Sequence, residues 1–505
     1  MLSIVPLGLS ELLALLSASL FGWYTITSII SWFRLRHVPG PFLASFSWLW
    51  LAQTASSGKQ FTIYQALGRK YGHLARVGPN MLVTDDPEVM RKLSSTRSTC
   101  NRDAWYDGGR WDPYVANLFT TTDLKTHDKM KARLSRAYSG RETDQLEPKI
   151  DTQVESVLNL IRQKYLSGSP SQEHLYLDCA KLSSFFTLDV ITSLAFGTEL
   201  GYVKADSDLY NFCEEARNHW LSLAMTMDVP WMRDIFYSSP FLKLFGPKAT
   251  DRSGVGRLMG VAHEVTQKKF TLKVEDEKNM MGYFARSGLS QRECEAEAVF
   301  MTVAGTDTTA SALRTAMLYI VTNPSVYNKL KAMISQALHE GKAASPITNE
   351  QAKAIPYLQA IIIETLRMRP PAEGLFAKVL PPEGDVIEGK FIPGGTAIGV
   401  NLPALMQNTA IFGPDVAMFR PERFTEAEEA TRTEMERVVQ LCFGYGRWVC
   451  TGKSIAFMEL GKIIFELLRT FDFQVVYPAK PWDSLSYNVF IEENMWMKVT
   501  EAHLA

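Results

Sequence analysis

Cysteine is scarce in this chain of 505 residues, and no two cysteines stand at a spacing that suggests a pair. The six positions are Cys100, Cys179, Cys213, Cys294, Cys442 and Cys450. Neither a disulfide framework nor a zinc site is therefore predicted. We expect the main part of such a chain to face a reducing compartment.

Net charge is also nearly absent. The 53 Lys and Arg residues balance 54 Asp and Glu residues, which leaves a formal net charge of -1. Nucleic-acid binders usually carry a clear basic excess, so we expect no nucleic-acid partner. Beyond the first forty residues we find no repeats, no low-complexity tracts and no nucleotide- or flavin-binding loop. The chain is rich in apolar residues. Hydrophobic residues make up 46% and aromatic residues 11%, which is enough for a sizeable core.

One long stretch near the start lacks charge altogether. The segment from Leu12 to Phe33 contains no charged residue, and Arg34 and Arg36 follow it. As a helix it would be roughly 33 Å long, which is enough to cross a bilayer core of about 30 Å. Because the positive charges stand only after the segment, the rest of the chain should lie on the cytoplasmic side.

Two other interpretations of this segment are weaker. A cleaved signal peptide would begin with positive charge and contain a shorter apolar run. A buried core helix is a further alternative, but a rigid break follows at Pro39-Gly40-Pro41, where proline cannot continue a helix. We therefore expect a single membrane anchor, residues 1–38, and one large domain, residues 39–505.

The large domain is predicted to be mainly α-helical with a small β portion. Its clearest helix should start at a capping box formed by Ser290 and Glu293 and run to Thr322. The other expected elements are a helical run over 348–370, a β-hairpin over 74–84 and a β-like stretch over 386–401.

The most informative segment is the glycine-rich loop 443–452, which contains Cys450 and precedes a helix-like run. A thiolate at that place is favoured by the unpaired N–H groups and the dipole of the following helix. Glycines without a Cβ also let a large, flat ligand approach the backbone. A thiolate beneath a flat ligand is what the fifth coordination position of a haem iron needs. A lone cysteine would more often be a buried apolar residue.

The loop resembles the haem-binding loop of the cytochrome P-450 superfamily, whose pattern is Phe-x-x-Gly-x-Arg-x-Cys-x-Gly. The matching residues are Phe443, Gly446, Cys450 and Gly452. The resemblance extends from about Pro39 to Lys498 and implies the P-450 fold. It also implies a haem b cofactor whose iron is bound by Cys450.

One position departs from the family pattern. The arginine stands one place early, at Arg447, and Trp448 occupies its usual position. This Gly-Arg-aromatic-x-Cys form is similar to that of fungal members of the pisatin-demethylase type. The resemblance implies that Arg447, Lys131 and Lys378 bind the haem propionates, with lysines in place of the family's arginines. The alternative for Lys131 is a solvated helix face.

The long helix carries a second family motif, Ala304-Gly305-Thr306-Asp307-Thr308-Thr309. A packing kink would explain an isolated Gly-Thr pair. The resemblance instead implies a pocket for dioxygen in which Thr308 holds a water or oxygen and Asp307 helps relay protons. Glu364, Arg367 and Arg423 match the family's buried structural triad. On spacing alone the first two would form an ordinary surface ion pair.

We therefore predict a membrane-bound haem-thiolate monooxygenase that oxidises a lipophilic small molecule in fungal secondary metabolism. It should be a single-pass protein of the endoplasmic reticulum membrane with a cytoplasmic catalytic domain. Electrons should come from an NADPH-dependent flavoprotein reductase, docked on a basic face that includes Lys129, Lys131, Arg133 and Lys453. The expected substrate-pocket residues are Trp105, Trp111, Met301, Phe376 and Phe490.

Two alternatives stay open. One is a haem-thiolate isomerase, dehydratase or peroxygenase that needs no reductase, although Asp307 and Thr308 argue against it. The other is a non-enzymatic membrane protein that binds haem or no haem at all.

Overall fold

The computed structural model describes residues 8–141, 143, 145–167, 175–271 and 278–503. The longer helices are α1 (Leu9–Leu35), α2 (Leu49–Ser56), α3 (Gln60–Tyr71), α4 (Pro87–Ser94), α5 (Leu124–Tyr138), α6 (Leu146–Leu160), α7 (Cys179–Phe196), α9 (Phe212–Asp228), α12 (Gly254–Thr271), α14 (Gln291–Thr322), α15 (Pro324–His339), α17 (Pro356–Met368), α21 (Glu429–Val439) and α22 (Lys453–Thr470). The shorter ones are α8 (Tyr202–Ala205), α10 (Pro230–Phe236), α11 (Ser239–Phe245), α13 (Met280–Arg286), α16 (Asn349–Lys353), α18 (Leu402–Leu405), α19 (Thr409–Phe412) and α20 (Glu422–Thr425). Single turns are η1 (Phe42–Ser45), η2 (Ala104–Gly109), η3 (Ile161–Tyr165), η4 (Leu209–Asn211), η5 (Gln440–Phe443) and η6 (Gly446–Trp448).

In the described part of the chain, the β portion is small and lies in four sheets. The largest has the strand order β1 (Leu74–Gly78), β2 (Met81–Thr84), β8 (Ala397–Val400), β5 (Lys378–Val379) and β3 (Asn101–Arg102). A three-stranded sheet contains β4 (Leu177–Asp178), β12 (Trp496–Glu501) and β9 (Phe471–Val475). Two hairpins pair β6 (Asp385–Ile387) with β7 (Lys390–Ile392) and β10 (Asp483–Ser486) with β11 (Phe490–Glu493). The mainly helical fold class is therefore confirmed.

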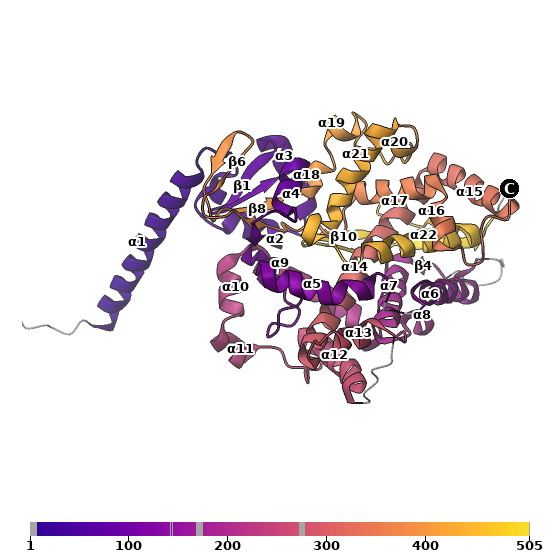
Figure 1. Ribbon diagram of the computed structural model, residues 1–505, viewed down its shortest axis with the longest axis horizontal. Coiled ribbons are helices and arrows are strands. Elements are labelled where there is room, and N and C mark those ends of the chain that lie inside the picture. Colours follow the sequence, from indigo (N-terminus) through magenta and orange to yellow (C-terminus); the bar gives the residue numbers. More distant parts are fainter. Residues whose placement is uncertain (1–7, 142, 144, 168–174, 272–277, 504–505) are drawn as a thin grey trace, which may run out of the picture.

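Helix α1 projects away from the rest of the molecule beside the largest sheet (Figure 1). Its apolar side chains face outward, as in Phe21, which is 73% exposed, and Trp23, which is 66% exposed. Helix α7 is also long and apolar, but it is almost wholly buried and belongs to the core. The chain thus has an N-terminal helix that fits a single transmembrane segment, in agreement with the sequence.

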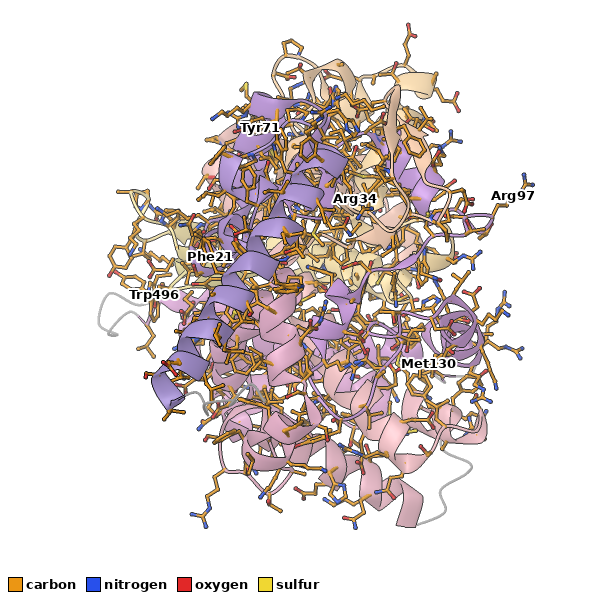
Figure 2. The ribbon with its side chains drawn as sticks, turned by 90° about the vertical axis from the view of Figure 1, so that its left-hand side faces the viewer. Phe21, Arg34, Tyr71, Arg97, Met130 and Trp496 are labelled. Atoms are coloured by element: carbon orange, nitrogen blue, oxygen red, sulfur yellow. The ribbon has the colours of Figure 1, made fainter. Side chains whose placement is uncertain are left out.

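The end of α1 packs on the large domain. Figure 2 shows Arg34 where the helix meets the domain and Phe21 farther along it. Arg34 donates a hydrogen bond of 2.9 Å to the carbonyl of Gly394. The Arg76 guanidinium donates one of 3.0 Å to the carbonyl of Ser31, and the Leu35 side chain is fully buried. Contacts between the helix and the domain therefore begin before residue 38.

The strongest local patterns of the sequence appear as expected. β1 and β2 form the antiparallel hairpin predicted over 74–84, and the stretch 386–401 forms β6, β7 and β8. The side chains of Ser290 and Glu293 cap α14 reciprocally. The helical run predicted over 348–370 is interrupted, because Ile355 takes an extended conformation before Pro356 and separates α16 from α17.

Candidate active site

Cys450 sits at the end of a tightly folded loop that joins η5 and η6 to α22. Its backbone N–H donates to the carbonyl of Phe443 at 2.7 Å, which closes the loop. Gly446 has φ +56°, and a Cβ there would lie 2.4 Å from the carbonyl oxygen of Ser94. Only glycine fits this close approach. Gly452 caps α22, so the thiol stands beside the N-terminus of that helix, as the sequence predicted.

The Cys450 thiol faces into a large cavity between this loop and α14. Across the cavity, α14 contributes Ala304, Gly305 and Thr308. The walls are largely apolar and include Met301 and Phe376, two of the expected pocket residues. Phe119 and Phe300 stack in the wall with 5.0 Å between ring centroids. The space between α14 and the loop suits a flat, apolar group with a thiol beneath it.

The surroundings of the Cys450 thiol act on its pKa in opposite directions. Burial raises the pKa of the thiol. The backbone N–H groups of Gly452 and Lys453 and the charge of Lys131 oppose that effect and favour the thiolate. The helix N-terminus thus acts in the predicted direction, but burial outweighs it in the protein alone. A bound metal cation would supply the remaining stabilisation of the thiolate.

Three cations gather at one end of the cavity: Arg102, Lys131 and Lys378. The Arg102 guanidinium lies over the Trp448 ring at 4.5 Å, and the Lys378 ammonium lies 5.3 Å from the centroid of the same ring. Lys378 also donates to the Tyr106 hydroxyl at 2.8 Å. The Arg102 Nε and the Trp448 Nε1 have no hydrogen-bond partner among the described residues.

Burial and mutual repulsion act against the charges of this cluster. Burial, and next the charge of Arg102, lowers the pKa of Lys131 to about 8. Burial also lowers the pKa of Arg102 to about 10 and that of Lys378 well below its usual value. Buried cations of this kind are stabilised by anions. Two haem propionates would supply that negative charge, so the donor set fits haem at this end of the cavity.

The predicted propionate ligands do not all point into this space. Lys378 lies in the cluster, and Lys131 donates to the carbonyls of Arg447 and Val449 at 2.6 and 2.8 Å. Arg447 turns away and pairs with Asp128 at 2.8 Å and with the carbonyl of Thr96.

Sequence reasoning missed Arg102. The available signal was Trp448, because this indole replaces an arginine and an indole ring attracts a cation over its face.

Asp307 and Thr308 lie on different sides of α14. Thr308 lines the cavity and its hydroxyl donates to the carbonyl of Ala304 at 2.9 Å. Asp307 faces the opposite side, where its Oδ2 accepts a hydrogen bond of 2.7 Å from the Trp220 indole N–H. Burial raises the pKa of Asp307 to about 6.

The other three expected pocket residues are not among the residues that line the cavity. Trp105 packs edge-on against Phe376 with 5.4 Å between centroids, so it supports the cavity wall from behind. Phe490 lines a second cavity on the far side of α14. Trp111 packs against Trp220 at 5.2 Å.

The predicted structural triad is confirmed. Arg367 donates two hydrogen bonds to the Glu364 carboxylate, of 2.6 and 2.8 Å, and Arg423 reaches the same carboxylate at 3.5 Å. All three side chains are buried. Arg367 also donates to the carbonyls of Met406 and Val416. The triad therefore ties α17 to the segment that leads toward the thiolate loop.

These features fit a haem-thiolate protein: a loop cysteine under an apolar cavity, a helix that presents Thr308 to the same cavity, and a cationic end. The sequence model of the family described as cytochrome P450 matches residues 37–495. The chain belongs to the cytochrome P450 family, and its relatives support an oxidoreductase of the monooxygenase type with a haem-thiolate cofactor.

Three similar fungal proteins illustrate the relationship. The chain is 50% identical to cytochrome P450 monooxygenase aba1 of Botryotinia fuckeliana, over 93% of this chain and 92% of that protein. It is 44% identical to cytochrome P450 monooxygenase ABA1 of Pyricularia oryzae, over 95% of each. It is 42% identical to cytochrome P450 monooxygenase abl1 of Leptosphaeria maculans, over 93% of this chain and 83% of that protein.

Proposed function

We propose that this chain is a membrane-anchored monooxygenase that inserts one oxygen atom of dioxygen into a lipophilic small molecule. The substrate, dioxygen, two electrons and two protons would give a hydroxylated product and one water. The observation that carries the proposal is the Cys450 thiol, which faces Thr308 of α14 across an apolar cavity. When bound, the haem-thiolate group supplies the activation of dioxygen.

The chain's own residues hold the reactants. Cys450 would bind the haem iron, and Arg102, Lys131 and Lys378 would hold the haem carboxylates at the cationic end. Aromatic walls such as Phe376 exclude water and select an apolar substrate. The Thr308 hydroxyl orients a water at its Oγ1.

Electrons would come from an NADPH-dependent flavoprotein reductase. Among the four basic residues proposed for docking, Lys131 and Lys453 are engaged within the loop region, where Lys453 donates to Gln440 at 2.7 Å. Lys129, which is exposed, and Arg133, which is half-buried, are the better contacts for an acidic partner surface. Charge reversal at Lys129 and Arg133 should weaken the reductase interaction and leave haem binding intact.

The setting we propose is the endoplasmic reticulum membrane of a fungus, with the catalytic domain in the cytoplasm. Arg34 and Arg36 follow the uncharged part of α1, which supports this orientation. The fungal relatives support a substrate from secondary metabolism.

The central experiment is a carbon monoxide difference spectrum of the reduced protein, with Cys450→Ala as control. The wild type should show a thiolate-type band that the variant lacks, and identical spectra would refute the proposal. Expression with a reductase in a microsomal host, screened against lipophilic metabolites by mass spectrometry, would then identify the substrate. Turnover that needs neither NADPH nor reductase would favour the isomerase, dehydratase or peroxygenase alternative.

A further inference from the structure

A second cavity lies behind α14, on the side that faces away from Cys450. Its volume is about 620 Å³, enough for a chain of water molecules. Asp307 and Trp220 line its inner part, and the ion pair of Arg217 with Glu493 lies where it meets solvent, since these side chains are 36% and 44% exposed. Polar and charged groups line much of this second cavity. The walls of the cavity that Cys450 faces, which we call the haem cavity, are mainly apolar.

Among the described residues, one hydrogen bond holds the Asp307 side chain in this cavity. The Trp220 indole N–H donates to its Oδ2 at 2.7 Å, and Trp220 is itself 8% exposed. The charged or titratable neighbours of Asp307 are Arg314 on α14, Glu492 on β11 and Cys213 on α9. Arg314 is paired with Glu492 at 3.1 Å. The indole is therefore the group that fixes the direction of the carboxyl.

Trp220 also contacts the segment that covers the haem cavity. Its ring packs edge-on against Trp111, with 5.2 Å between centroids and 80° between planes. Trp111 follows η2, and η2 carries Tyr106 in the cavity wall. The same segment is attached to α9 by a hydrogen bond of 2.8 Å from the Thr226 hydroxyl to the carbonyl of Gly108. These contacts couple the position of η2 to that of α9 and Trp220.

We propose that Trp220 is a positioning residue for proton delivery that holds the Asp307 carboxyl in the second cavity. Because Trp220 contacts Trp111, which follows η2, the position of the Asp307 carboxyl depends on that segment. This inference rests on the proposed monooxygenase function. Each turnover consumes two protons. Asp307 passes each proton from its side of α14 to the Thr308 side when the carboxyl turns from the second cavity. A proton from solvent then replaces it through the second cavity, so the carboxyl ends each cycle unchanged.

The packing alternative is that Trp220 merely fills space between α9 and α14. That role would need an aromatic ring but no N–H group. Trp220→Phe keeps the ring and removes the donor, and Trp220→His offers a ring N–H again. Tyr357→Phe is the control, because it also keeps a ring and removes a donor. The Tyr357 hydroxyl on α17 donates to the Glu422 carboxylate at the same 2.7 Å, and neither residue lines the second cavity.

The first measurement needs no turnover. Infrared spectra of the ferric holoenzyme at low pH, in H2O and D2O, would detect the protonated Asp307 carboxyl as the band that Asp307→Asn removes. Trp220→Phe should shift this band to higher frequency, because a donated hydrogen bond weakens the C=O bond, and Trp220→His should shift it part of the way back. Trp111→Leu should move the band in the direction of Trp220→Phe. Trp111→Phe, which keeps an edge contact, and Tyr357→Phe should not move it.

The second measurement is the reduction of dioxygen by NADPH and reductase, with hydrogen peroxide and water measured separately. Trp220→Phe should slow water formation about tenfold, raise the share of hydrogen peroxide and increase the D2O isotope effect, since misplaced acid groups deliver protons less well. A band and an isotope effect that both equal those of the wild type in Trp220→Phe would overturn the proposal. If wild-type protein shows no reductase-dependent oxygen reduction, the proposed function fails, and the infrared band still decides whether Trp220 positions Asp307.

Discussion

The guanidinium of Arg102 lies over the Trp448 ring, with 4.5 Å between its Cζ and the ring centroid. Trp448 stands where the family pattern has an arginine, and Arg102 comes from β3 in a different part of the chain. The positive charge that the thiolate loop lacks at this position is therefore supplied by a strand of the largest sheet. Arg447, the arginine of the loop, pairs with Asp128 instead.

Replacement of Arg102 should weaken haem retention. A hydrogen bond to a charged group contributes about 1.5–3 kcal/mol, so Arg102→Gln should accelerate haem loss by about 10–100-fold. Transfer of haem to an excess of apomyoglobin measures this rate. Arg447→Gln is the matched control, because a partly exposed ion pair contributes about 0–1 kcal/mol. Equal effects of the two substitutions would contradict our assignment of the propionate site.

The reaction should depend on the protonation of Asp307. Burial raises the pKa of this carboxyl to about 6, so the proton-donating form is lost as the pH rises through that value. The rate of NADPH-driven water formation should fall over the same range if proton donation limits it. Asp307→Asn should remove this titration and lower the rate about 100-fold. A pH profile that is unchanged in Asp307→Asn would exclude this residue as the proton donor.

The buried triad should be needed for folding. Arg367→Met leaves the Glu364 carboxylate buried without the two hydrogen bonds and the positive charge of Arg367. This loss should lower the free energy of unfolding by about 3–5 kcal/mol. Denaturant unfolding and haem content measure the effect. The double variant Glu364→Leu with Arg367→Met should recover part of the loss, because it removes the uncompensated charge. A double variant no more stable than the single one would show that the carbonyl contacts of Arg367 dominate.

Glu373 should make the stability of the protein depend on pH. Glu373 is 1% exposed, and burial raises its pKa to about 8, although the neighbouring Ser486 hydroxyl acts in the opposite direction. The folded protein then holds a proton that the unfolded chain has released, so stability rises as the pH falls from about 8 toward the ordinary value of about 4.5. Glu373→Gln, which cannot ionise, should raise Tm most above pH 8, with the difference shrinking toward about pH 5.

Two comparisons isolate this effect. Asp228, whose pKa burial raises to about 7, adds its own slope to the wild type and the variant alike. Glu383→Gln changes an exposed carboxylate nearby in the sequence and should leave the pH dependence of Tm as in the wild type. A Tm difference between Glu373→Gln and the wild type that stays constant with pH would argue against a buried, protonated Glu373.

Two truncations should separate the anchor from the packed end of α1. Removal of residues 1–27 should release the protein from membranes and leave Tm nearly unchanged, since the side chains described in this range, residues 8–27, are mostly exposed. Removal of residues 1–38 also deletes Leu35 and Val38, which are buried against Leu74 and Ile398. That loss should cost about 3 kcal/mol or more. Equal Tm values for the two proteins would support the simpler boundary after residue 38.

Much of the site was readable from the sequence because its parts are local patterns. The spacing of loop 443–452 placed Cys450 before a helix, and the capping box at Ser290 placed Asp307 and Thr308 on one long helix. The uncharged run of α1 needed only residue types and length. Each of these features is formed by residues that are close together in the sequence. The spacing of such residues determines on which face of a helix or strand they lie.

The tertiary structure decided which partners these local elements meet. Asp307 and Thr308 are adjacent, but the position of α14 between two cavities determines that one faces Trp220 and the other the haem cavity. Arg102 reaches Trp448 because β3 pairs with β5, a contact between distant segments. Such contacts follow from the packing of the whole chain, because many distant residues could meet a given side chain and only the folded core selects one.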